Sequence, residues 1–388
     1  MSTTQAKNAQ ELSIQERFHE YMRHPMAPYS ILKGATISLL VFGLVMVTSA
    51  SSVFAYQHYG NSYYLATRQI IFAIIGVSLM FGAARLPVIF YRRVSALFLI
   101  FSIVLLVLVL FIGTSVYGQR NWLEFGPIRV QPSEFAKLGV AVWGAHIFAS
   151  KYEYLYIRRE LISPVMPVFG LVLGLILAEG DLGTALVIAP IMASLYFFVG
   201  APRSWFAILL GGAAAGLAFL AYEAPYRVAR FVSWLHSGSD PQGVGFQFAH
   251  GKQALGSGGF GGVGLGASRE KWGTLPEAHT DFIYAVIGEE WGIGGTLIVL
   301  ALFVAIVVSG IRIARNSSDH FVQLASLAVV VWIAMQTFVN IGAVLGVMPI
   351  TGVPLPLVSY GGSSLLPTLM ALGMLMSFAK HGAYDEEE

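Results

Sequence analysis

The stretch SALFLIFSIVLLVLVLFI, residues 95–112, contains no charged side chain, and its only polar residues are Ser95 and Ser102. A helix needs about 20 predominantly apolar residues to cross the hydrocarbon core of a bilayer. Similar runs recur along the 388-residue chain, which is 56% hydrophobic and only 11% charged. This composition predicts a polytopic membrane protein.

The apolar runs on either side of this stretch predict about ten transmembrane helices. Backbone groups in hydrocarbon must be hydrogen-bonded within their own segment, and the runs lack the two-residue alternation of a membrane barrel. We therefore expect an all-α polytopic membrane protein. The predicted spans lie near residues 35–55, 67–84, 95–112, 133–150, 161–178, 183–199, 205–222, 282–310, 321–345 and 363–380.

The distribution of basic residues predicts the orientation, because Lys and Arg are enriched in cytoplasmic loops. With both termini cytoplasmic, the short outer loops contain neither residue type, whereas most Lys and Arg fall inside. The short outer loops are 56–66, 179–182 and 346–362. The predicted organisation is a cytoplasmic N-terminal segment 1–34, a ten-helix transmembrane domain 35–380 with a large extracytoplasmic loop 223–281 between helices 7 and 8, and a cytoplasmic tail 381–388.

Charge and cysteine content exclude several classes of function. A net charge of +2 gives no basic domain for nucleic acid, so no nucleic-acid partner is expected. The chain has no cysteine, which excludes disulfides, thiol nucleophiles and cysteine-based metal sites.

Basic residues on the outer side gather in two segments, 113–137 and 223–281. One interpretation is an ordinary solvated loop, because long translocated loops are largely exempt from the charge rule. The other is a cationic site for an anionic ligand. In VQPSEFAKLGV, residues 130–140, Pro132 suits the first turn of a helix and places Glu134 and Lys137 one turn apart. Lys137 either forms an ion pair with Glu134 and nothing more, or meets a substrate phosphate or a catalytic carboxylate.

The stretch LPEAHTDFIYAVIGEEWG, residues 275–292, carries acids into an apolar run. If a helix starts near Asp281, this residue caps it, and its carboxylate is ionised at neutral pH. Small residues share a face with Asp281, so another helix or a ligand can approach closely. Asp281 is either a plain cap or a functional acid, and Glu289 and Glu290 either form a structural hydrogen-bond network or belong to a site. The shared face comprises Asp281, Ala285, Gly288, Glu289 and Gly292.

Three further motifs interrupt the apolar pattern. AEGDLGTA (178–185) predicts a tight outer hairpin between two spans. VNIGAVLGVMPITGVPLPLVSYGGSSLLP (339–367) predicts an irregular segment, tolerable only against protein or a wet cavity. GSGGFGGVGLG (256–266) matches a dinucleotide-binding pattern but lacks the strand and helix of that unit, so we interpret it as a flexible loop with close backbone approaches.

Four stretches together carry a family resemblance: RNWLEFGPIRVQPSEFAKL, YRVARFVSWLHSGSDPQGVGFQ, LPEAHTDFIYAVIGEEWG and NIGAVLGVMPITGVPLPLVSYGGSSL. In this order they resemble the FtsW/RodA/SpoVE family of bacterial shape, elongation, division and sporulation proteins, over residues 35–380. Ala278 and the HTD of 279–281 are closer to the FtsW and SpoVE branches, whereas TGVPLP at 351–356 also resembles RodA. The chain resembles FtsW most. EFGPIRV (124–130) departs from the family pattern, which affects the contacts expected there.

The resemblance implies a ten-helix, multi-pass enzyme of the bacterial cytoplasmic (inner) membrane. It would be a peptidoglycan glycosyltransferase that polymerises lipid II at the outer face, working with a class B penicillin-binding protein and other membrane proteins of the division or elongation complex. The family's proposed acid/base carries over to Asp281, and its QPSE-x-x-K positions carry over to Lys137, with Arg129 and Glu134 beside it.

This chemistry fits the residues, because pyrophosphate leaves readily once its charge is neutralised. One carboxylate base and cations then suffice, unlike the paired carboxylates of a glycosidase. We expect Asp281 to accept the proton of the acceptor hydroxyl, while Lys137 and Arg129, with a divalent cation (Mg²⁺ or Mn²⁺), stabilise the phosphate. A lipid-side opening is expected beside the small-residue face and residues 359–364. The expected substrate-binding residues are Arg129, Glu134, Lys137, His279, Thr280, Gly288, Glu289, Ser359, Gly361, Gly362 and Ser363.

Two functions of other classes remain open from the residues. A lipid II flippase would also use intramembrane acids and cationic pockets, but would need a charged path to the cytoplasmic face. A division scaffold would have no chemistry of its own and no use for the Asp281 carboxylate.

Overall fold

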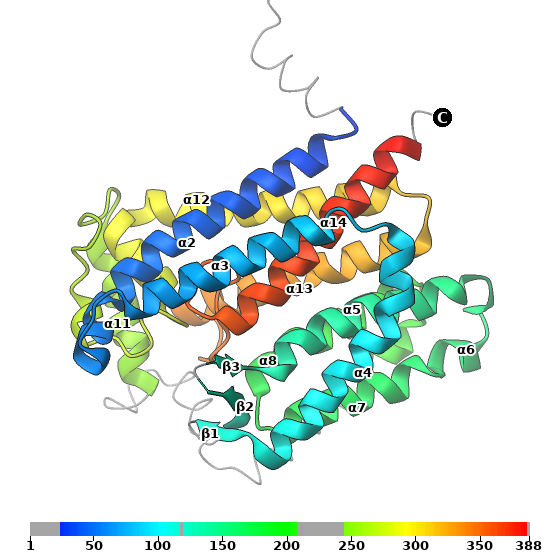
Figure 1. Cartoon of the computed structure of the whole chain (residues 1–388), viewed down its shortest axis with the longest axis horizontal. Coiled ribbons are helices and arrows are strands. Elements are labelled where there is room, and N and C mark those ends of the chain that lie inside the picture. Colours follow the sequence, from blue (N-terminus) through cyan, green and yellow to red (C-terminus); the bar gives the residue numbers. More distant parts are fainter. Residues whose placement is uncertain (1–23, 117–118, 127, 208–210, 212–243, 386–388) are drawn as a thin grey trace, which may run out of the picture.

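The structure is a computed structural model that describes residues 24–116, 119–126, 128–207, 211 and 244–385 (Figure 1). It is mostly helical. Its helices are α2 (Ala27–Tyr59), α3 (Tyr64–Ala83), α4 (Val88–Ile112), α5 (Pro132–Ser150), α6 (Arg158–Ile162), α7 (Val165–Ala178), α8 (Leu182–Phe198), α11 (Val244–Gly258), α12 (Ile283–Asn316), α13 (His320–Leu345) and α14 (Gly362–Asp385), with 3-10 turns at Tyr152–Tyr154 and Glu270–Trp272.

Seven helical segments of the described chain are long and apolar enough to cross a membrane, which makes this a multi-pass membrane protein. They are α2, α3, α4, the α6–α7 segment, α12, α13 and α14. The apolar helix α8 is shorter, and α5 carries Glu134 and Lys137 in its first two turns. The predicted span at 205–222 lies almost wholly outside the described residues. The first part of the predicted loop 223–281, residues 223–243, also lies outside them.

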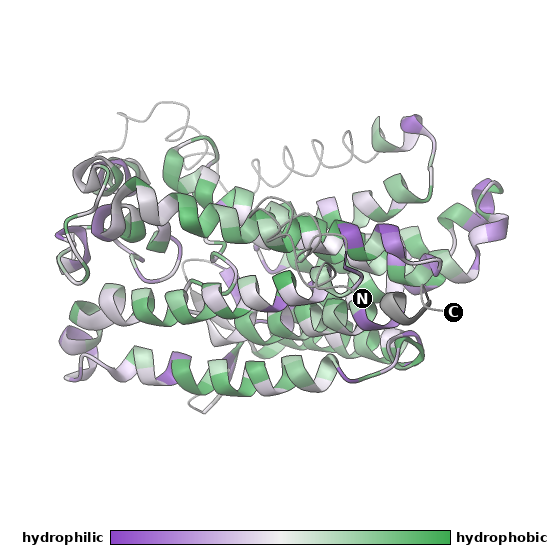
Figure 2. Ribbon diagram, turned by 90° about the horizontal axis from the view of Figure 1, so that it is seen from above, coloured by the Kyte–Doolittle hydropathy of each residue, from purple (hydrophilic) through white to green (hydrophobic). Residues whose placement is uncertain are grey.

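The helices lie roughly along one common direction (Figure 1). The central helix α13 packs against α5, α8 and α12, while α14 packs against α3. Hydrophobic residues cover the lengths of the helices, and hydrophilic residues gather mainly toward the two ends of the bundle (Figure 2). The start of α2 and the end of α14 lie at one end, and α11 lies at the other (Figure 1).

A small antiparallel sheet is the main departure from the predicted all-α fold. It contains β1 (Thr114–Val116), β2 (Gln119–Phe125) and β3 (Ile128–Val130) in the order β1-β2-β3. Its register pairs Glu124 with Arg129. Asn121 and Leu123 of β2 are buried, while Arg120 and Glu124 on either side of them are exposed, as in a strand with one buried face. The helix α5 then begins at Pro132 as predicted.

The predicted span 282–310 corresponds to α12, but this helix is interrupted at Gly292, where φ is 66° and ψ is −163°. A side chain at Gly292 would start 2.5 Å from the backbone N of Gly262 and O of Phe260, so only glycine permits this contact. The predicted Asp281 cap is wrong. The helix begins at Ile283, its N-cap is Phe282, and no side chain caps it.

Candidate functional site

Asp281 lies in the turn that precedes α12 and is half-buried. The Asn340 side chain, on α13, donates to Asp281 O at 2.9 Å and to Val353 O at 2.8 Å. The Asp281 carboxylate faces Gly352, since a Cβ on that glycine would lie 3.6 Å from Asp281 Oδ2. Asn340 therefore fixes the backbone of this turn against the irregular segment between α13 and α14.

The same irregular segment is joined to His279 and Thr280. Ser359 Oγ donates to Thr280 O at 2.6 Å, and Tyr360 N donates to His279 O at 3.0 Å. The Gln69 side chain on α3 donates to Ser359 O at 3.2 Å. These contacts join the predicted residues of two distant motifs in one unit.

The start of α14 extends this unit toward α5. Gly361 N donates to the Gln69 amide oxygen at 3.2 Å, and Gly362 is the first residue of α14. Ser363 Oγ accepts a hydrogen bond of 2.7 Å from Gln131 N, and Gln131 is the N-cap of α5. The predicted serine and glycine positions therefore lie beside the helix that carries Lys137.

Lys137 is almost completely buried, and its ammonium is held by protein groups. Its Nζ lies 2.8 Å from Glu134 Oε2, which is the ion pair of the first alternative, and donates to Gln336 Oε1 at 2.8 Å. Trp332 Nε1 donates to the same Gln336 oxygen at 2.7 Å, and the ammonium lies 5.3 Å from the centre of the Trp332 ring. These groups fix the charge in one position.

One face of α13 connects Asp281 with Lys137. Gln336 contacts Lys137, and Asn340, one helical turn later, contacts the Asp281 backbone. Gln336 Nε2 also donates to Pro354 O at 3.0 Å, next to the Val353 carbonyl bound by Asn340. The carboxylate and the cation predicted from separate motifs are therefore positioned by neighbouring side chains of a single helix.

His279 is 7% exposed and lies between aromatic rings. Its ring centre is 4.9 Å from that of Phe54 and 5.7 Å from that of Tyr360. Burial lowers the pKa of His279, and the nearby charge of His58 lowers it further, against an opposing effect of Glu277. The imidazole beside Asp281 is therefore neutral at neutral pH.

Arg129 lies on β3 and forms an ion pair of 2.8 Å with Glu124 on β2. Its side chain remains 62% exposed. Burial raises the pKa of Tyr360, and the charges of Arg68 and then Arg129 oppose that rise, so both cations act on the edge of this site. The sequence prediction omitted Arg68, which directly precedes Gln69 on α3.

Gly288 and Glu289 lie in a different environment from the rest of the predicted site. A Cβ on Gly288 would lie 2.3 Å from Leu255 of α11, so a protein side chain covers the small-residue face. The Glu289 carboxylate accepts hydrogen bonds from Ser268 Oγ at 2.5 Å and Arg269 N at 2.9 Å. These contacts hold the outer loop against α12.

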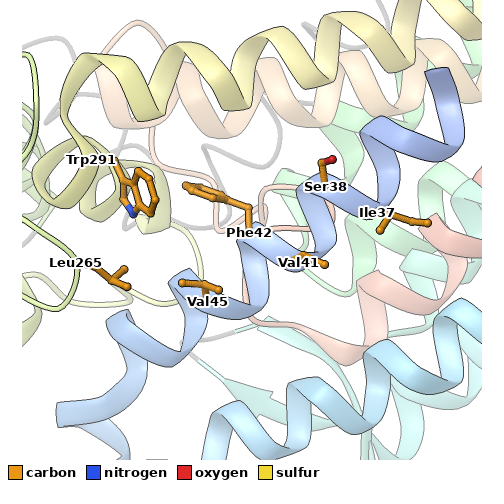
Figure 3. Close-up of a pocket in the computed structure, with 7 residues that line it drawn as sticks. All are labelled: Ile37, Ser38, Val41, Phe42, Val45, Leu265 and Trp291. Atoms are coloured by element: carbon orange, nitrogen blue, oxygen red, sulfur yellow. The ribbon is translucent and has the colours of Figure 1, made fainter.

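Glu290 continues this second network toward α2. Its carboxylate accepts hydrogen bonds from Ser49 Oγ at 2.7 Å and from Lys271 Nζ at 3.3 Å. An apolar groove of about 610 Å³ adjoins it between α2 and the break in α12 (Figure 3). The groove is lined by Ile37, Ser38, Val41, Phe42, Val45, Leu265 and Trp291. Its lining contains none of the residues predicted to bind substrate.

Sequence reasoning missed Gln336 and Asn340, which connect the site. The available signal was two amide side chains four residues apart in an otherwise apolar span, where an unpartnered polar group is costly. Sequence reasoning also identified no ligands for the expected divalent cation. Within the described residues, no group of three or more His, Asp or Glu side chains is arranged to hold a metal ion.

Comparison with known proteins adds independent information. The sequence pattern of the FtsW/RodA/SpoVE family, described as cell cycle proteins, matches residues 30–384. A probable peptidoglycan glycosyltransferase FtsW of Mycobacterium tuberculosis is 37% identical over 379 residues, covering 97% of this chain and 72% of that protein. Stage V sporulation protein E of Bacillus subtilis is 38% identical over 361 residues, covering 92% and 98% of the two chains.

Solved structures agree with the sequence relatives. A chain from a peptidoglycan synthase complex, described as coordinating polymerization and crosslinking, superimposes with a TM-score of 0.73 at 28% identity, covering 90% of this chain and 97% of that one. The rod shape determining protein RodA of Thermus thermophilus gives a TM-score of 0.67 at 28% identity, covering 90% and 95%. The chain belongs to the FtsW/RodA/SpoVE family.

Proposed function

We propose that this protein is a peptidoglycan glycosyltransferase that polymerises lipid II at the outer face of the bacterial cytoplasmic membrane. The observation that carries the proposal is the arrangement of Asp281 and Lys137 along one face of α13, through Asn340 and Gln336. The names of the relatives support the same activity. An anionic group and a fixed cation are the two charges that transfer from a pyrophosphate donor requires.

In the proposed reaction, an acceptor sugar hydroxyl attacks the anomeric carbon of the donor. The Asp281 carboxylate takes the hydroxyl proton as the new glycosidic bond forms. The bond to the polyprenyl pyrophosphate breaks, and its electron pair leaves with the phosphate oxygen. Lys137 is held by Glu134 and Gln336 and offers a preorganised positive charge, while exposed Arg129 offers a second cation to the pyrophosphate.

The groove along α2 supports a lipid-linked substrate. Its lining on α2 ends at Val45, Ser49 contacts Glu290 one turn later, and the Phe54 ring contacts that of His279. At 1.5 Å per residue, Phe54 lies about 14 Å beyond Val45 along the helix. A polyprenyl chain in the groove would therefore direct its polar head toward the end of α2 that carries the candidate site.

The direct test is Asp281→Asn in purified protein supplied with lipid II. Loss of the general base predicts a fall in polymer formation of about 100-fold or more, with an unchanged melting temperature. Glu160→Gln is a matched control, because Glu160 pairs with Lys151 at the opposite end of the bundle. Polymer yield near that of the control would exclude Asp281 from the mechanism.

Two further experiments distinguish the other functions. Reconstituted vesicles that move lipid II across the bilayer without polymerising it would favour a flippase. Normal growth of cells carrying Asp281→Asn would favour a scaffold.

The role of Lys137 is tested by Lys137→Ala. The substitution should reduce turnover in protein that remains folded, whereas unchanged turnover would leave Lys137 with a structural role only.

We also propose a class B penicillin-binding protein as the partner, with other membrane proteins of the division or elongation complex. The structural neighbour from a peptidoglycan synthase complex supports this proposal. Glycan polymer measured on gels with and without the cognate penicillin-binding protein tests it. We expect more polymer with the partner, and equal yields would contradict a functional partnership.

A further inference from the structure

The turn between α7 and α8 brings two buried acids against the sheet. Glu179 is 2% exposed and Asp181 is 4% exposed. Arg120 N, on β2, donates to Glu179 O at 3.0 Å. The next residue, Asn121, is also buried, and its amide donates to Asp181 Oδ2 at 3.1 Å. The Asn121 and Asp181 side chains therefore meet where the sheet joins the bundle, and the backbone of Glu179 is bound to the adjacent residue of β2.

The two acids differ in the number of hydrogen bonds that their carboxylates accept. The Asp181 carboxylate accepts hydrogen bonds from Thr184 N and Oγ1, from the Asn121 amide and from the Gln131 amide. By contrast, both carboxylate oxygens of Glu179 and Asn121 Oδ1 are buried without a hydrogen-bond partner. Each such buried acceptor costs about 1–3 kcal/mol. Three of them at one junction mark a place for a missing positive or donating group.

We propose that the Glu179 carboxylate and Asn121 Oδ1 bind a divalent cation of the Ca²⁺ type, with Asp181 Oδ1, which accepts a hydrogen bond from Thr184 N, as the third ligand. Carboxylates and amide carbonyls are the hard oxygen ligands that Ca²⁺ prefers, and its irregular coordination accepts backbone carbonyls and water for the remaining positions. Mg²⁺ fits less well, because it demands near-octahedral geometry and gives up its water reluctantly. This cation is separate from the one expected at the pyrophosphate.

The consequence of binding is structural. The cation joins β2 to the α7–α8 turn, and Gln131 transmits this constraint, because its amide contacts Asp181 while its backbone caps α5. The position of α5, and with it that of Lys137, then depends on the cation. The inference needs no assumption about the reaction and stands independently of the proposed function.

Binding is measured on the purified full chain in detergent with Tb³⁺ as a luminescent probe and Ca²⁺ as competitor. We expect tryptophan-sensitised emission that Ca²⁺ displaces, and a melting temperature that rises by several degrees with Ca²⁺ compared with EDTA. Glu179→Gln should lose both responses, and Glu160→Gln should keep both. Emission that Ca²⁺ does not displace, or equal responses of wild type and Glu179→Gln, would overturn the proposal.

The competing explanation is a carboxylic acid that keeps its proton. Burial and then the Asp181 charge raise the pKa of Glu179 to about 9 when no cation is bound. Glutamine imitates the protonated acid, so this explanation predicts the same melting temperature for wild type and Glu179→Gln in Ca²⁺ and in EDTA. Asn121→Asp gives a second test if Glu179→Gln does not fold. The added carboxylate should tighten Ca²⁺ binding about 10-fold, whereas a proton-only site would bind no Ca²⁺ and would be destabilised.

Discussion

The two acidic regions of residues 275–292 have different environments. Asp281 is half-buried, and Asn340 holds its backbone carbonyl. Glu289, at the other end of the first helical segment of α12, is 1% exposed, and both of its carboxylate oxygens accept hydrogen bonds from the outer loop. Two acids of one motif therefore have different surroundings, although both lie near an apolar helix. Outer-loop groups bind the carboxylate of Glu289, whereas Asn340 of α13 binds the backbone of Asp281.

Near Glu289, a glycine-rich loop forms hydrogen bonds with backbone groups at the interruption of α12. At the Gly292 break, Ile293 N donates to Gly259 O at 3.0 Å, outside the helix. In the opposite direction, Val263 N donates to Glu289 O and Gly264 N donates to Glu290 O. The glycine-rich loop thus replaces backbone hydrogen bonds that the break removed, as backbone near a membrane requires. This explains why the loop approaches α12 so closely.

The largest expected effect on stability comes from adding a side chain where the glycine-rich loop contacts the backbone of α12. Gly262 has φ of +77°, and a Cβ there would lie 2.1 Å from Glu290 O. Gly262→Ala therefore combines a left-handed alanine with a backbone clash, and we expect a loss of about 3 kcal/mol or more, measured by thermal unfolding in detergent. Gly261→Ala is the matched control, because nothing lies within 4 Å of its Cβ position. Equal melting temperatures for the two variants would contradict the docked loop.

A smaller loss is expected for Glu289→Ala. The substitution leaves Ser268 Oγ and Arg269 N without their acceptor, which costs about 2 kcal/mol in the free energy of unfolding. Protein that remains folded should still polymerise lipid II, in contrast to Asp281→Asn. Chemical denaturation and the polymer assay on the same samples measure both properties. Stable but inactive Glu289→Ala protein would instead place Glu289 in the reaction.

Hydropathy predicted the apolar helices well, because burial in lipid requires long uncharged runs whatever their neighbours. The ion pair of Glu134 and Lys137 also followed from local spacing. The sheet at 114–130 and the break at Gly292 were missed for different reasons. The strands are short and lie between two strong helical signals, and the glycine break exists only because a distant loop supplies its hydrogen bonds.

The site was predictable in its parts but not in its connections. His279, Thr280 and Ser359 were identified from motifs, and the structure joins Ser359 to Thr280, and Tyr360 to His279, by direct hydrogen bonds. The grouping of Gly288 and Glu289 with Asp281 rested on helical periodicity and, for Glu289, on the cost of an acid within an apolar span. Periodicity identifies residues that share a face, but not which neighbour covers it, and Leu255 covers Gly288.

A moderate effect is expected from acid, through His279. Its pKa is lowered below the ordinary 6.5 in the folded protein, so the unfolded chain takes up the proton first as the pH falls. The contribution of His279 to stability is therefore constant above pH 6.5 and declines below it, by at most about 1.4 kcal/mol per pH unit. Melting temperatures of wild type and His279→Gln between pH 5 and 8 test this. The variant should show the weaker acid dependence, and parallel curves would contradict a buried neutral imidazole.

The smallest effect on stability is expected at Arg129. Its ion pair with Glu124 is largely exposed, and such pairs contribute about 0–1 kcal/mol, so Arg129→Ala should leave the melting temperature nearly unchanged. If Arg129 contacts the pyrophosphate, the same variant should raise KM for lipid II several-fold. Arg129→Lys keeps the charge and should recover part of that loss. Glu124→Gln removes only the ion-pair partner, so its KM should stay near that of wild type. An equal rise in KM for Glu124→Gln and Arg129→Ala would show that the pair shapes the sheet rather than binding substrate.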